Sequence, residues 1–270
     1  RIIRAERDTV YIAYFGNDHQ FIYDRQPLSS TSLSWTPKKD FARQIPNGAC
    51  GDGAMLIQTY NGTTLIGEHS IRFMLYVWNG SDCYPSFTSL ALTGVNTWNG
   101  YYVKGKSSVN ATINGATAPY GATVRSYKIL GQGLNATTSS ATSGVLNTTG
   151  THTYTATITD SRGRSVSGTA SITIHDYYSP QISGVRAYRT NSDGKANPQG
   201  NYVRLEWTFN HCNIASANLN ARQFSIFARE RGASGWTVVT GQTNYSTTAY
   251  NAQEATTKGV YDTSKSYEFL

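Results

Sequence analysis

Hydrophobic and polar residues alternate along most of this chain with a period of two, and no stretch of twelve residues carries the apolar stripe of a helix. The clearest case is residues 151–159, where every odd position is threonine and Tyr154 and Ile158 stand at even positions. This pattern predicts a half-buried antiparallel strand with its threonines facing outward. The turn-like sequence Asp-Ser-Arg-Gly at 160–163 and a second alternating run at 165–174 complete a predicted hairpin.

The hairpin ends a series of short predicted strands that begins near Pro85. Alternating apolar residues at 109–113 precede an Asn-Gly turn at 114–115, and residues 124–130 form another strand-like run. Tyr154 fits two roles, the tyrosine corner of immunoglobulin-like sandwiches or an ordinary core tyrosine, and the sequence leaves both open. Several short strands within about ninety residues predict a β-sandwich.

Two further modules flank this one. After the break at 177–180, apolar residues alternate at 203–209 and at 224–228, and Trp207 and Trp236 are expected to lie in the core of the C-terminal module.

In the N-terminal module, residues 55–60 end in an Asn-Gly pair at 61–62, the strongest short hairpin signal. Apolar residues lie just beyond the pair at 65–66, and an alternating strand at 71–77 closes the module. Residues 37–46 are the one place where a short helix or irregular loop is expected.

The expected fold class is therefore all-β, with tandem immunoglobulin-like or fibronectin III-like β-sandwich domains at 1–80, 81–176 and 177–270. The chain opens without an initiator methionine or signal peptide and stops at an apolar, strand-like run at 267–270. Both ends look like cuts inside a longer polypeptide, so the two outer modules are expected to be truncated. The missing signal peptide then says nothing about secretion.

Composition narrows the class of protein. Only 14% of the residues are charged, whereas serine and threonine supply about a fifth of the chain, and this composition argues against a coiled coil. The longest apolar stretch is a few residues, so no membrane insertion is expected, and 39% hydrophobic residues can bury a core. The net charge of +7 comes from scattered basic residues, which argues against a nucleic-acid partner and favours weak attraction to anionic polymers such as cell-wall polysaccharide.

No pattern of catalytic, cofactor-binding or metal-ligating residues emerges, and the expectation is a protein that is not an enzyme and needs no cofactor or metal. Residues 131–136 match G-x-G-x-x-A after a predicted strand, but no helix follows to hold a pyrophosphate. Cys50, Cys83 and Cys212 lie far apart without zinc spacing and are expected to be buried free thiols.

Aromatic side chains are the remaining candidates for a binding surface. Trp98 stands beside an Asn-Gly pair at 99–100, and Tyr101 and Tyr102 follow it. Such rings can stack on sugars, but packing within strands or between domains, and contact with another protein, are the competing interpretations.

The order of several motifs resembles that of minor structural proteins of siphophages that infect Gram-positive bacteria. The motifs are Trp-Thr-Pro at 35–37, Ile-Pro-Asn at 45–47, Thr-Tyr-Asn-Gly at 59–62, Tyr-Tyr-Val-Lys-Gly-Lys-Ser at 101–107, Thr-Asp-Ser-Arg-Gly-Arg at 159–164 and Arg-Ala-Tyr-Arg at 186–189. The resemblance spans most of the chain. It implies a tail component of the virion, extracellular, that belongs to a fibre, spike or baseplate and carries tandem immunoglobulin-like modules.

In such a protein the modules would act as a spacer and as a host-surface adhesion module. The implied partners are other virion tail proteins, host cell-wall polysaccharide and further copies of the same chain. Arg162 and Arg164 could then form an exposed recognition tip, although a hairpin turn alone explains this sequence. The alternatives are a bacterial cell-surface adhesin built from immunoglobulin-like repeats and an accessory carbohydrate-binding part of a cell-wall enzyme.

Overall fold

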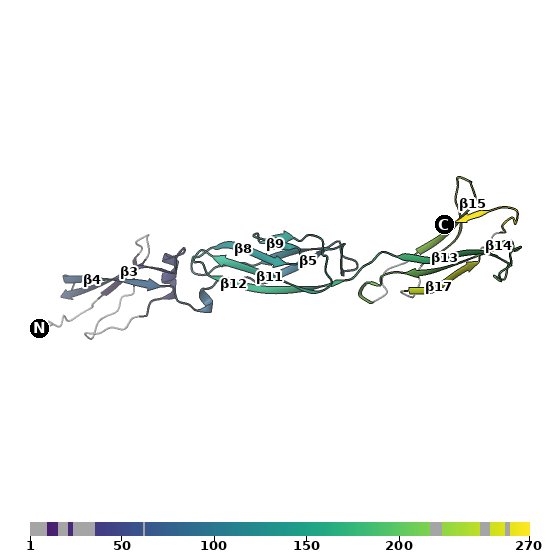
Figure 1. Ribbon diagram of the computed structural model, residues 1–270. Coiled ribbons are helices and arrows are strands. Elements are labelled where there is room, and N and C mark those ends of the chain that lie inside the picture. Colours follow the sequence, from purple (N-terminus) through teal and green to yellow (C-terminus); the bar gives the residue numbers. More distant parts are fainter. Residues whose placement is uncertain are drawn as a thin grey trace. The chain divides into compact units, whose positions relative to one another are not determined.

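The computed structural model describes residues 10–15, 21–23, 36–61, 63–216, 223–243, 249–256 and 260–270, drawn as a ribbon in Figure 1. These residues form β-strands joined by loops and three short 3-10 helices, which confirms the all-β prediction. Within them, no helix is long and apolar enough to cross a membrane. The chain divides into two compact units, one built from residues 1–95, 108–144 and 151–172 and the other from residues 96–107, 145–150 and 173–270. The division into three sandwich modules stays a prediction.

The first unit begins with an antiparallel sheet in the order β2-β1-β3-β4. Its strands are β2 (Phe21–Tyr23), β1 (Val10–Phe15), β3 (Cys50–Asn61) and β4 (Thr64–Tyr76). The predicted hairpin is confirmed because Asn61 pairs with Thr64, although Gly62 itself lies outside the described residues. β4 is one continuous strand where the sequence indicated two apolar pieces. The 3-10 helix η1 (Lys39–Gln44) fills the place predicted for a short helix or loop and buries Phe41 and Ala42.

Two sheets follow in the chain, and each buries one face. The first has the order β10-β7-β5, with β10 (Ser140–Thr142), β7 (Ser108–Asn114) and β5 (Ser89–Val95). The alternating residues Val109, Ala111 and Ile113 of β7 are buried, as predicted. The second sheet has the order β6-β12-β11-β8-β9, with β8 (Val124–Gly131) and β9 (Leu134–Ala136) at one end.

The predicted hairpin at 151–174 is the centre of this second sheet, formed by β11 (Gly150–Asp160) and β12 (Ser165–His175). Tyr154, Ala156 and Ile158 are fully buried between threonines. On the outward face, hydroxyl groups pair across the two strands at 2.9, 2.7 and 2.8 Å. The pairs are Thr153 with Ser171, Thr157 with Ser167, and Thr159 with Ser165. The abundance of serine and threonine is therefore partly a property of this exposed sheet face.

Tyr154 explains the glycine of the G-x-G-x-x-A motif. Its ring is 0% exposed, and its hydroxyl donates to the carbonyl oxygen of Gln132 at 2.9 Å. Gly131 lies against the ring, and Gly133 turns the chain from β8 to β9 with φ of +67°. Of the two roles left open for Tyr154, a core tyrosine fits better, because its hydroxyl partner lies 22 residues upstream and not a few residues upstream as in a tyrosine corner. The G-x-G-x-x-A motif is a hairpin turn without a following helix.

The second unit contains two more sheets and the short strand β6 (Tyr102–Val103), which pairs in parallel with the end of β12 at Ile174 and His175. One sheet has the order β13-β14-β17, with β13 (Gln181–Thr190), β14 (Tyr202–Asn210) and β17 (Ala249–Thr256). The other has the order β16-β15-β18, with β16 (Thr237–Thr243), β15 (Gln223–Glu230) and β18 (Tyr267–Phe269).

Trp207 and Trp236 were both predicted to lie in the core of these two sheets. Trp207 is buried with Val203, Leu205 and Ile226, as predicted. Trp236 is 39% exposed, so the prediction of a core position there was wrong. It stands in the loop before β16, and the Arg229 guanidinium lies 4.3 Å from its ring centroid.

The three cysteines are free thiols, as predicted, but they are not all buried. Cys83 and Cys212 are buried, whereas Cys50, at the first position of β3, is exposed. The prediction of a buried thiol at Cys50 was therefore wrong.

Candidate functional site

The turn that joins β11 to β12 is built around the buried carboxylate of Asp160. Its Oδ1 accepts hydrogen bonds from the backbone N–H groups of Arg162 and Arg164, at 2.9 and 2.8 Å. Gly163 closes the turn with φ of +82°, and its N–H donates to the Asp160 carbonyl at 3.0 Å. Aspartate and glycine therefore serve as the sequence predicted, one as a local acceptor and the other as a residue with positive φ. This local structure fixes the directions of the two arginines.

Arg162 points inward and donates to four backbone carbonyls of the first unit. Nε bonds Ile45 at 3.0 Å and Nη1 bonds Pro119 at 2.9 Å. Nη2 bonds Ala42 at 2.9 Å and Tyr120 at 2.5 Å. The residue is only 8% exposed, and this burial lowers the pKa of Arg162 from its usual value, a shift that the charge of Asp160 opposes.

Arg164 bonds three more carbonyls in the same unit. Nη1 donates to Cys83 at 3.0 Å, and Nη2 donates to Val77 and to Trp78, each at 3.0 Å. The guanidinium also lies 5.5 Å from the centroid of the Tyr84 ring. Four acceptors of Arg162 and three of Arg164 make seven carbonyls, and we call this set with its two arginines the arginine joint.

The acceptors come from irregular segments, and two of the carbonyls, those of Ala42 and Pro119, also accept a backbone N–H from their own segment. Ala42 lies in η1 and Ile45 just after it, while Cys83 ends the 3-10 helix η2 (Ser81–Cys83). The ends of helices leave unpaired carbonyl groups, and guanidinium offers five donors in a planar fork. Arginine is therefore well suited to join several chain segments at one point.

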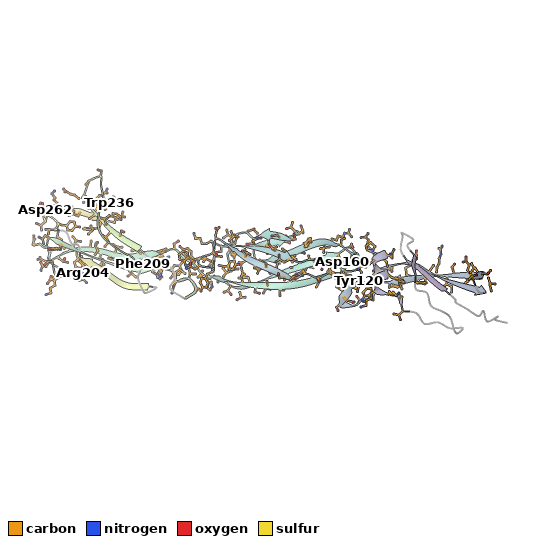
Figure 2. All side chains as sticks on the ribbon, turned by 180° about the vertical axis from the view of Figure 1, so that it is seen from behind. Tyr120, Asp160, Arg204, Phe209, Trp236 and Asp262 are labelled. Carbon is orange, nitrogen blue, oxygen red and sulfur yellow. The ribbon has the colours of Figure 1, made fainter. Side chains whose placement is uncertain are left out.

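An apolar cluster packs beside the arginine joint. Ala42, Val77 and Cys83 are buried together, and Ile45, Trp78 and Tyr120 pack against them. The rings of Trp78 and Tyr120 meet edge to face at 4.8 Å. Figure 2 labels Asp160 and Tyr120 at the same end of the β11–β12 hairpin, consistent with the bond from the Ser161 N–H to the Thr123 carbonyl at 2.8 Å.

The geometry differs from the expectation that Arg162 and Arg164 form an exposed surface. Arg162 was expected as a surface contact, but its burial removes it from the surface because its guanidinium is satisfied by backbone carbonyls. Arg164 is half-buried and engaged in the same way. No sequence pattern indicates the acceptors, which lie 42 to 120 residues away from the arginines.

The predicted aromatic residues lie in the second unit, where the structure brings two of them together. Trp98 and Tyr101 exchange backbone hydrogen bonds of 3.0 and 2.8 Å across a tight turn. Asn99 and Gly100 supply the two positive φ angles, 45° and 83°, typical of a two-residue hairpin turn. Trp98 is 41% exposed, and we call the pair Trp98 and Tyr101 the aromatic turn.

The residues around the aromatic turn are partly buried and partly cationic. The Tyr101 ring meets His175 edge to face at 5.2 Å. Tyr102 lies in β6, where burial raises the pKa of its hydroxyl above the usual value. Lys104 forms an ion pair with Asp176 at 3.2 Å, which lowers the pKa of that carboxyl. The exposed indole of Trp98 is chemically suited to stacking on a sugar ring.

Two cavities are further candidates for a binding site. One of about 400 Å³ in the first unit is lined by apolar residues and by Lys38 and Lys39, and none of its lining residues is a carboxylate, histidine or cysteine. One of about 350 Å³ in the second unit contains Arg229 and Glu230 among valines and tyrosines. Across the described ranges, no three metal-binding side chains of histidine, cysteine, aspartate or glutamate lie together.

Comparison with known proteins places the chain in a family. The family model described as "Siphovirus protein of unknown function (DUF859)" matches residues 2–270. No curated protein matches the chain. Since the match covers almost every residue, the chain belongs to this family of siphovirus proteins.

Proposed function

We propose that this siphovirus protein is a structural component of the phage tail, in a fibre, spike or baseplate, and acts as a spacer. The observation that carries the proposal is the match of residues 2–270 to a family of siphovirus proteins. The arginine joint, in which seven hydrogen bonds from two side chains hold the chain to itself, supports the role of a rigid spacer. The all-β architecture, with the sheets β10-β7-β5 and β6-β12-β11-β8-β9 that each bury one face, supports modules of the immunoglobulin or fibronectin III type. We propose no enzymatic activity and no cofactor for this chain.

The same protein would contact the host surface through the aromatic turn. Trp98 is exposed at the tip of a tight hairpin, and the net charge of +7 favours an anionic cell-wall polysaccharide as partner. A single stacked ring gives weak binding. Several copies of the chain in one tail would multiply weak contacts into useful avidity, so a homo-oligomer fits this role.

Immunogold electron microscopy of virions with an antibody against this chain tests the tail assignment. Gold particles on the tail would support it. Gold on the capsid alone, or on no part of a purified virion, would overturn it.

A cell-wall pull-down tests the adhesion part separately. Trp98→Ala should weaken binding to purified host cell walls by about 5- to 10-fold, the loss expected for one stacked aromatic ring. Trp236→Ala is the matched control because Trp236 is almost equally exposed, 39% against 41%. Equal losses in both variants would exclude a specific role of the aromatic turn. Binding that does not weaken in higher salt would exclude electrostatic attraction.

A further inference from the structure

The arginine joint lies at the end of the β3–β4 hairpin where the chain enters β3 and leaves β4, and it touches both flanking segments, here called the incoming and the outgoing connection. The incoming connection contains Ala42 and Ile45, whose carbonyls bond Arg162, and it enters β3 at Cys50. The outgoing connection leaves β4 after Tyr76 and presents the carbonyls of residues 77, 78 and 83 to Arg164. Each arginine therefore holds one of the two connections.

We infer that the arginine joint is an intrachain docking site that fixes the β3–β4 hairpin to the β11–β12 hairpin as one rigid body. One flexible connection lets attached elements rotate, and linkers between modules usually behave in that way. Two connections held at separate points by different side chains do not, because any rotation must break hydrogen bonds on one of them. The inference concerns the mechanics of the first unit and holds wherever the protein is placed in a virion.

The chemistry at the joint requires arginine rather than any cation. Arg162 reaches four carbonyls through three nitrogen atoms, and Arg164 reaches three through two. Lysine has three donors on a single nitrogen, so it cannot bond the four acceptors of Arg162 at once and lacks the planar fork with which each arginine reaches separate segments. Asp160 is the positioning residue, because its carboxylate fixes the turn and places a negative charge near the buried Arg162 guanidinium.

Ser161, between Asp160 and Arg162, adds a third point of contact. Its hydroxyl donates to the Pro46 carbonyl at 2.5 Å and accepts from the Thr123 N–H at 3.1 Å. The N–H of Val77 donates to the Ala49 carbonyl at 2.8 Å, which ties the incoming connection to the outgoing one. The two connections are thus bonded to each other as well as to the turn.

The buried thiol of Cys83 can report whether the β3–β4 hairpin is docked. Cys83 is 0% exposed, packs in the cluster with Ala42 and Val77, and offers its carbonyl to Arg164. Its thiol becomes reactive only when the joint opens. Cys212 is buried in the second unit and reports opening there, while the exposed Cys50 gives the rate of labelling without protection.

Thiol labelling of the full chain, resolved by mass spectrometry of the three cysteine peptides, tests the inference. The variants are Arg162→Lys and Arg164→Lys, and the matched control is Arg125→Lys, an exposed position on β8. Each joint variant should accelerate labelling of Cys83 by at least about tenfold, because charge-assisted bonds to several carbonyls are lost. Labelling of Cys212 should stay within about twofold of the unsubstituted chain.

Two results would overturn the inference. The first is an unchanged Cys83 rate in both joint variants. The second is equal acceleration at Cys83 and Cys212, which would mean general unfolding rather than local undocking. Hydrogen exchange gives an independent measurement, since peptides covering 42–49 and 77–84 should exchange faster in the joint variants while a peptide covering β15 stays unchanged.

Discussion

Replacing Gly131 by alanine should destabilise the first unit through one contact. A Cβ atom at this position would stand 2.1, 2.4 and 2.7 Å from three carbon atoms of the Tyr154 ring. The ring cannot turn aside freely, because it is fully buried and its hydroxyl is bonded to the Gln132 carbonyl. Overpacking of this kind costs about 1–3 kcal/mol. If the ring also loses its hydrogen bond, about 1 kcal/mol is added, and the expected total is about 2–4 kcal/mol.

Gly67→Ala is the control, because a Cβ there meets nothing within 4 Å. It should leave stability unchanged or raise it slightly, since alanine loses less backbone entropy than glycine. Hydrogen exchange of the peptide 150–160 measures the local free energy of opening without assuming that the whole chain unfolds in one step. In a Tyr154→Leu background, Gly131→Ala should cost almost nothing. A cost that persists in that background would refute the argument, as would a Gly131→Ala effect equal to that of the control.

Three other results are expected. Asp160→Ala should cost about 1–3 kcal/mol in hydrogen-exchange stability, because it leaves the turn N–H groups of Arg162 and Arg164 without their acceptor, while Asp160→Asn, which keeps an acceptor oxygen, should cost less. The pKa of Asp262 is lowered from 3.8 by the hydroxyl and N–H of Ser264, so this stabilisation is present above that value and is lost as the pH falls through the lowered pKa. Melting temperatures of wild type and Asp262→Asn should therefore differ at pH 7 and converge as the pH falls through the lowered pKa. Mild oxidation should link two chains through the exposed Cys50, and a Cys50→Ser chain should stay monomeric on a non-reducing gel.

The strands were predictable because their information is local. Threonine alternating with Tyr154, Ala156 and Ile158 fixes both the strand and its buried face, and the structure confirms each of these positions. The Asn-Gly pair at 61–62 likewise predicted the β3–β4 hairpin. In both cases neighbouring residues alone determine the outcome.

The arginine joint was not predictable because its information is distant. Nothing near residues 160–164 indicates that carbonyls at Ala42 or Val77 will meet the turn, since backbone acceptors have no sequence signature. Two arginines in a turn of a chain with 14% charged residues were the one available hint. The prediction of a core position for Trp236 was wrong for a related reason. The exposure of this residue depends on where β16 begins rather than on its own hydrophobicity.

The hydroxyl pairs along β11 and β12 have a consequence for the environment that this face can tolerate. Serine and threonine hydroxyls neither gain nor lose a proton across the ordinary pH range, and their mutual hydrogen bonds carry no net charge for salt to screen. Faces held together by lysine–glutamate pairs change when acidity or ionic strength changes. The hydroxyl pairs of Thr153, Thr157 and Thr159 should therefore persist at low pH and at high salt, unlike the charge of Lys128, which lies opposite Thr157 on β8.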